Sequence, residues 1–197
     1  MEALNPEREA HWRASFASWL GQLGDDTEAH CRLLEQADVP DGARKLAAES
    51  LNHLLHSVEL IPEGVEALGY LENAFAFRVL AERALRDDPR LAAADPSGTL
   101  ARLNDEAGEL AGFLGDEDHA RLRSWAVRNA RIARGRQLQE LLQDAPSDAP
   151  DAENARAAAL EEARAWAHGY RTPSFGAGEQ DLTKLRAFLK TRLARPL

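Results

Sequence analysis

The sequence predicts an all-α protein, and three observations lead to this prediction. Residues that favour helices (Ala, Leu, Glu and Arg) dominate the 197-residue chain, whereas the strand-favouring Val, Ile and Thr are scarce. Apolar residues recur with helical spacing over several stretches, and turn-forming residues separate these stretches. Hydrophobic residues make up 44% of the chain, which is enough for the core of one domain. We therefore expect an irregular bundle of about seven or eight helices.

The first helix is predicted to start at Asn5-Pro6-Glu7, because Asn caps helices, Pro suits the first turn and Glu favours the positive end. The low helix propensity of Gly21 and Gly24 indicates that the first helix ends near these residues, and a short second helix is predicted from Asp25 to Gln36. A third helix is expected after the turn at 38–42. The apolar stripe of the first helix consists of Trp12, Phe16, Trp19, Leu20 and Leu23.

Pro62 divides the next helical pattern, because proline cannot continue a helix but can open a new one. The third helix should therefore end near Leu60, and a fourth should begin at Pro62. A Pro- and Asp-rich linker over residues 144–151 separates a helical core domain, 1–143, from a C-terminal helical pair, 152–197. The later helices are predicted over Thr99–Leu114, Glu117–Gln143, Ala152–Ala167 and Glu179–Leu193.

The charge and cysteine content of the chain indicate which classes of partner and which cellular compartment to expect. The formal net charge of −9 repels phosphate groups and argues against nucleic acid as a general partner. The single cysteine, Cys31, allows no internal disulfide, which suits a reducing cytoplasm. No apolar run approaches the roughly 20 residues of a membrane span, and the first twenty residues hold no signal-peptide core. We expect a cytoplasmic protein without a transmembrane segment, and peripheral contact with a membrane stays open.

Two motifs in the stretch from Leu51 to Leu85 carry a family resemblance. The sequence reads His-Ser-Val-Glu-Leu-Ile-Pro-Glu over 56–63 and Leu-Gly-Tyr-Leu-Glu-Asn over 68–73, followed by an apolar helix. This stretch resembles the YkvA-like family, whose motifs read Ser-Pro-Ile-Asp-Leu-Ile-Pro-Asp and Leu-Gly-Tyr-Leu-Asp-Asp and whose biochemical role is unassigned. The resemblance implies a helical hairpin over residues 44–85 at the centre of the bundle. The family's aspartates are replaced here by three glutamates and one asparagine.

Those four positions form the first candidate site: Glu59, Glu63, Glu72 and Asn73. A bend at Pro62 would gather them, so that they could bind a cation or a basic ligand. The alternative, which we favour, is that they cap helix ends and pair with arginines such as Arg44, Arg78 or Arg83.

Two further sets of residues are candidates. His53, His56 and Glu59 follow a three-residue spacing and could bind a divalent metal if a partner helix added a carboxylate, although the spacing drifts around the helix. The favoured interpretation is that the histidines are polar residues at the margin of the helix. The segment 121–136 is rich in arginine, and Arg121, Arg128 and Arg131 share one helix face. The favoured interpretation is that these arginines pair with acids of the first half of the chain or form a solvated face. That face could instead bind an acidic protein, a second copy of the chain or, as a weaker alternative, nucleic acid.

No catalytic constellation stands out, so the favoured interpretation is a non-enzymatic cytoplasmic interaction protein of the YkvA-like type. It would bind a protein partner or itself and need no cofactor. A metal-binding protein or metal-dependent enzyme that uses the acidic and histidine cluster near Pro62 is the alternative.

Overall fold

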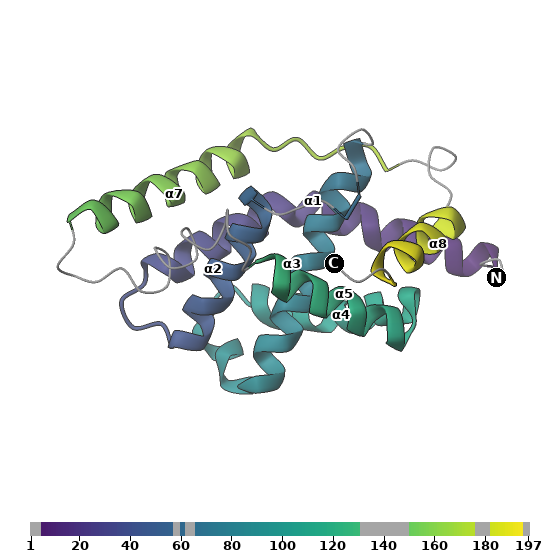
Figure 1. Ribbon diagram of the computed structural model, residues 1–197, viewed down its shortest axis with the longest axis horizontal. Helices are drawn as coiled ribbons and strands as arrows, with labels where there is room; N and C mark the ends of the chain where they lie inside the picture. The colour runs from purple at the N-terminus through teal and green to yellow at the C-terminus, as the bar shows by residue number, and fades with distance from the viewer. Residues whose placement is uncertain (1–4, 57–59, 62–65, 131–149, 176–181, 195–197) are drawn as a thin grey trace.

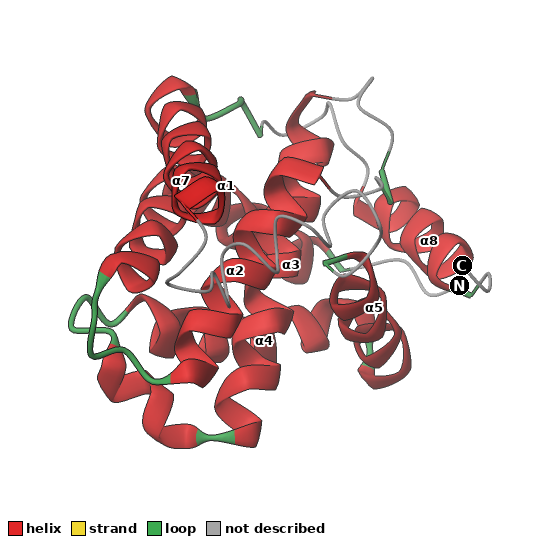
Figure 2. Ribbon diagram, turned by 60° about the vertical axis from the view of Figure 1, so that its left-hand side comes forward, coloured by secondary structure: helices red, strands yellow, loops and turns green. Residues whose placement is uncertain are grey.

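The computed structural model describes residues 5–56, 60–61, 66–130, 150–175 and 182–194 (Figure 1). Within these ranges every regular element is a helix and no strand occurs (Figure 2). The prediction of an all-α bundle of seven or eight helices is therefore confirmed. In chain order the elements are α1 (Pro6–Glu35), α2 (Asp41–His56), α3 (Glu66–Asp87), the short 3-10 helix η1 (Pro89–Ala94), α4 (Thr99–Leu114), α5 (Asp116–Asn129), α7 (Pro150–Gly169) and α8 (Leu182–Leu193).

The predicted division of the first helix was wrong. Helix α1 runs without interruption for 30 residues through both glycines, and the side chain of Asn5 caps it by accepting a hydrogen bond from the Arg8 N–H at 2.8 Å. A glycine costs a helix only about 1 kcal/mol, and burial of the apolar stripe outweighs that cost. Gly24 faces α7, and a Cβ built there would lie 3.4 Å from the Ala167 carbonyl oxygen, which is an ordinary van der Waals contact.

Helix α3 is the central element and packs against α1, α2, α4 and α5. A helix with neighbours on most sides must be apolar nearly all round. Residues 74–81 of α3 are accordingly all buried. The ring of Phe16 lies at the meeting point of α1, α3 and α4, with its centroid 5.2 Å from that of Phe75 and 4.9 Å from that of Phe113. Trp12 and Trp19 of the predicted apolar stripe are buried, as is Trp125 of α5.

One charged side chain lies inside this core. Arg78 of α3 is fully buried, and its guanidinium lies 4.3 Å from the centre of the Trp19 ring. Its Nη2 lies 2.6 Å from Oε2 of Glu106 in α4, and its Nη1 donates to the Ala74 carbonyl at 2.8 Å. Arg102 of α4 pairs with the same glutamate at 3.0 Å and with the buried Asp26 of α1. Two arginines and two carboxylates thus balance one another and join α1, α3 and α4.

The two C-terminal helices dock on the bundle. Helix α7 lies along α1, where Arg164 pairs with Glu35 at 2.5 Å and the Tyr170 hydroxyl donates to the Leu20 carbonyl at 2.9 Å (Figure 1). Helix α8 packs against α5 and α4. Most of the predicted linker lies outside the described residues, and its last two positions begin α7. The buried side of α8 consists of Leu182, Leu185, Leu189 and Leu193.

None of the helices in the described ranges has the length and apolarity that crossing a membrane requires.

Candidate functional site

The structure brings one member of the predicted acidic cluster to the bend. Glu72 of α3 is 3% exposed, and its Oε2 accepts a hydrogen bond from the backbone N–H of Ile61 at 2.6 Å. On the other side, Nε of Arg192 in α8 donates to the Leu60 carbonyl at 3.2 Å. Helices α3 and α8 therefore hold residues 60–61 between them. For Glu72, this hydrogen bond caps a buried backbone N–H at the bend, outside any described helix, and capping of helix ends by the cluster stays a prediction.

The other members of that cluster are only partly described. Glu59 and Glu63 lie outside the described residues, and Asn73 is half-buried on α3. Convergence of all four positions on one ligand stays a prediction.

Replacement of Glu72 should destabilise the bend. We expect Glu72→Ala to lower the free energy of unfolding by about 1–3 kcal/mol, because it leaves a buried backbone N–H without its acceptor. Glu72→Gln retains an acceptor oxygen and should lose less than half as much. Urea denaturation followed by circular dichroism measures both values. Equal losses for the two variants would contradict the capping role.

The histidine set predicted for a metal is described at one of its three positions. His53 of α2 is fully buried, and its ring stands edge-on to Trp125 of α5 at a centroid distance of 5.2 Å. Burial lowers the pKa of His53 from 6.5 to about 3, so the imidazole is neutral at pH 7. The side chains of His56 and Glu59 lie outside the described residues. Among the side chains that the structure does place, no group of three or more His, Cys, Asp or Glu residues could hold a metal ion.

The arginines of the predicted basic face differ in their surroundings. Arg121 pairs within its own helix with Glu117 at 2.6 Å and Asp118 at 3.0 Å, so its charge is already balanced. Arg128, two turns further along α5, is exposed, and within the described part of the chain it forms no ion pair. Arg131 lies outside the described residues. Of the two described members of this face, Arg128 is therefore the one with charge to offer a partner.

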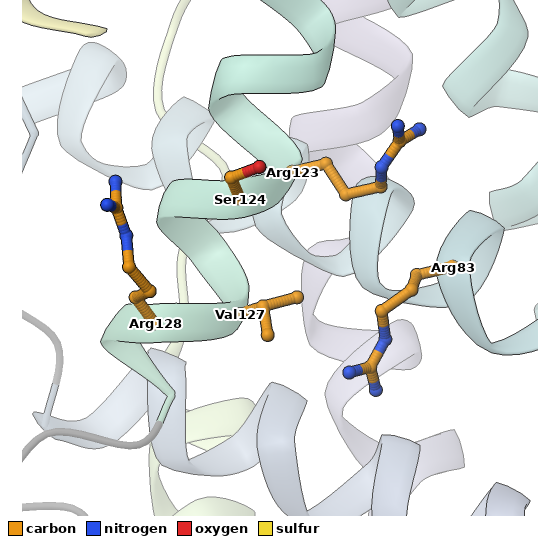
Figure 3. Close-up of a pocket in the computed structure, with 5 residues that line it drawn as sticks. All are labelled: Arg83, Arg123, Ser124, Val127 and Arg128. Atoms are coloured by element: carbon orange, nitrogen blue, oxygen red, sulfur yellow. The ribbon is translucent and has the colours of Figure 1, made fainter.

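A groove beside α5 joins Arg128 to residues that were not predicted as a site. It has a volume of about 310 Å³ and is shown in Figure 3. Pockets for small ligands begin at about this size. The residues that line it are Arg83 of α3 and Arg123, Ser124, Val127 and Arg128 of α5. In Figure 3, Val127 points into the space between Arg83 and Arg123, whereas Arg128 extends from the opposite side of the helix.

Two of the groove arginines are held by carboxylates on neighbouring helices. Arg83 donates through Nη2 to the buried Glu49 of α2. Arg123 donates through Nη1 to Oε2 of Glu82 in α3 at 3.0 Å. Glu82 also pairs with Arg86 at 2.5 Å. These bonds fix the orientation of both guanidinium groups before any ligand arrives.

The charge around the groove is positive although the chain is acidic. Three guanidinium groups, those of Arg83, Arg123 and Arg128, line it, and the described carboxylates that pair with them are those of Glu49 and Glu82. The nearby His119, whose Nε2 lies 3.7 Å from Glu82, adds no charge at pH 7, because burial lowers its pKa. The lining arginines and their paired carboxylates therefore carry a net charge of +1, which would attract a carboxylate or another anion.

Part of this groove could have been found from the sequence. Arg123 and Val127 are four residues apart and therefore share one face of the helix, and Ser124 and Arg128 share the next face in the same way. Arg83 could not have been found in this way, because its place in the groove depends on how α3 packs against α5. The sequence indicates Arg83 only as an ion-pair partner of the acidic cluster near Pro62, and in the structure it pairs with Glu49 of α2.

No model of a known protein family matches the chain, and the searches of curated proteins and of solved structures also found no match. The resemblance of residues 44–85 to the YkvA-like family therefore stays a prediction.

Proposed function

We propose that the protein is a non-enzymatic helical binding protein that holds an acidic segment of a protein partner in the groove beside α5. The observation that carries this proposal is the groove itself, whose lining arginines and their paired carboxylates have a net charge of +1 in a chain of net charge −9. The partner is a different protein or a second copy of the chain. The sequence-based expectation places this binding in the cytoplasm.

Carboxylates suit this groove better than a nucleic-acid backbone does. Proteins that bind single strands combine a basic track with aromatic side chains on which bases stack. The aromatic residue of α5, Trp125, is 2% exposed and is occupied by packing against His53. The planar guanidinium groups match the oxygens of a carboxylate and of a phosphate alike, and none of the described residues that line the groove is aromatic. An acidic protein segment therefore uses what the groove provides.

A charge-reversal experiment tests this proposal. A fluorescently labelled peptide of alternating Glu and Ala should bind the protein in an anisotropy titration, and its affinity should fall between 50 and 200 mM salt, because surface charges are screened. We expect Arg128→Glu to weaken binding at least about tenfold, which corresponds to about 1.4 kcal/mol.

The matched control is Lys45→Glu, which makes the same charge change at an exposed position on α2. It should leave the affinity within about twofold of the original value. Equal weakening by both variants would show a general effect of net charge and would contradict the proposal, as would tighter binding of a single-stranded oligonucleotide than of the peptide. If the original protein forms dimers in sedimentation and Arg128→Glu forms only monomers, the partner is a second copy.

A further inference from the structure

The apolar side chain at the centre of the groove indicates a more specific ligand. Val127 is half-buried and points into the space between Arg83 and Arg123 (Figure 3). The arginines contribute aliphatic stems as well as charged ends, since an Arg side chain buries its methylene groups while its guanidinium stays in water. The groove therefore combines apolar walls with charged ends. A purely acidic ligand would contact the charged ends and leave the apolar walls without a partner.

The fixed and the unpaired arginines have different roles in this arrangement. Arg83 and Arg123 are each bound to a carboxylate through one guanidinium nitrogen, and a guanidinium carries five N–H donors. Their order in the unbound protein reduces the entropy cost of binding a further carboxylate. Arg128, which extends from the other side of α5, can bind a second carboxylate of the same segment. The apolar space at Val127 lies between these two positions.

We infer that the groove recognises a segment in which one apolar side chain stands between two acidic residues. The apolar side chain would contact Val127, one carboxylate would bind Arg83 or Arg123, and the other would bind Arg128. This inference rests on the proposed function and adds to it the order of residues in the bound segment.

Three labelled peptides of equal charge and length test the inference. Their central triplets are Glu-Leu-Glu, Glu-Ala-Glu and Glu-Ser-Glu, set in identical Ser and Gly flanks. We expect the leucine peptide to bind about fivefold to tenfold more tightly than the other two, because burial of the extra methylene groups adds to the affinity. The variant Val127→Ser should remove this preference for leucine while changing the affinity for the alanine peptide less than about twofold.

The possible outcomes separate this inference from the proposed function. If all three peptides bind equally and Arg128→Glu still weakens them, the groove binds acidic segments and the inference is wrong. If no peptide binds, both are wrong. Should Val127→Ser fail to fold, as judged by circular dichroism, the comparison of the three peptides on the original protein still decides.

Discussion

Replacement of Arg78 by alanine should lower the free energy of unfolding by about 3–5 kcal/mol, the loss expected when one partner of a buried ion pair is removed. Arg78 is fully buried, and its removal leaves Glu106 and the buried Asp26 with Arg102 as their remaining arginine. It also removes the contact of the guanidinium with the Trp19 ring. Urea denaturation at pH 7, followed by circular dichroism, measures the change.

Arg86→Ala is the control for this prediction. Arg86 makes an ion pair with Glu82 on the same helix, but its side chain is 55% exposed, so its loss should cost about 0–1 kcal/mol. A second comparison uses Arg78→Met with and without Glu106→Gln. The double variant should be the more stable of the two, because one fewer carboxylate remains uncompensated. A loss below about 1 kcal/mol for Arg78→Ala would show that the buried pairs contribute little.

Acid should destabilise the protein well above the pH at which its carboxylates titrate. Burial lowers the pKa of His53 to about 3 and that of His30 to about 4, whereas both would titrate at 6.5 in the unfolded chain. The unfolded state therefore binds protons that the folded state excludes, so the free energy of unfolding falls as the pH drops below 6.5. Two such histidines amount to about 4 kcal/mol between pH 7 and pH 5. Burial raises the pKa of Asp26, which opposes part of this loss at lower pH.

The variant His53→Leu isolates one of the two histidines. It should reduce the loss of stability between pH 7 and pH 5 by about 2 kcal/mol, since it removes one of the buried histidines that take up a proton on unfolding. Its stability at pH 7 should stay equal or rise, because both ring nitrogens of His53 are buried without hydrogen-bond partners. His168→Leu, which replaces an exposed histidine of α7, serves as the control. An unaltered profile in His53→Leu would contradict the burial of a neutral imidazole.

The elements that sequence reasoning placed best are those with strong local signals. The predicted helix Thr99–Leu114 has the same bounds in the structure, because it lies between Gly98 and Gly115, whose φ angles of 73° and 86° favour glycine. The continuity of α1 was not predicted, because the low helix propensity of Gly21 and Gly24 suggests a break, whereas packing of the apolar stripe against other helices keeps the helix intact. A helix boundary could be predicted where residues next to it in the sequence determine it, and could not where packing against distant helices determines it.

Contacts between distant segments explain what the sequence could not reveal. Arginine is normally a surface residue, and nothing beside Arg78 in the sequence indicates that Glu106 and Asp26 will meet it inside the core. The groove depends in the same way on the packing of α3 against α5. Of the predicted site residues, Glu72 reaches the bend and Arg128 reaches the groove, whereas Arg121 is neutralised by its own helix.

The position of Cys31 makes it a natural reporter for the attachment of α7. Its thiol is fully buried on α1, near Arg164 of α7, and burial raises its pKa to about 12, so that the unreactive protonated form prevails. A thiol-specific reagent can reach it only when the helices separate. The rate at which such a reagent labels the folded protein therefore measures how often α7 leaves the bundle.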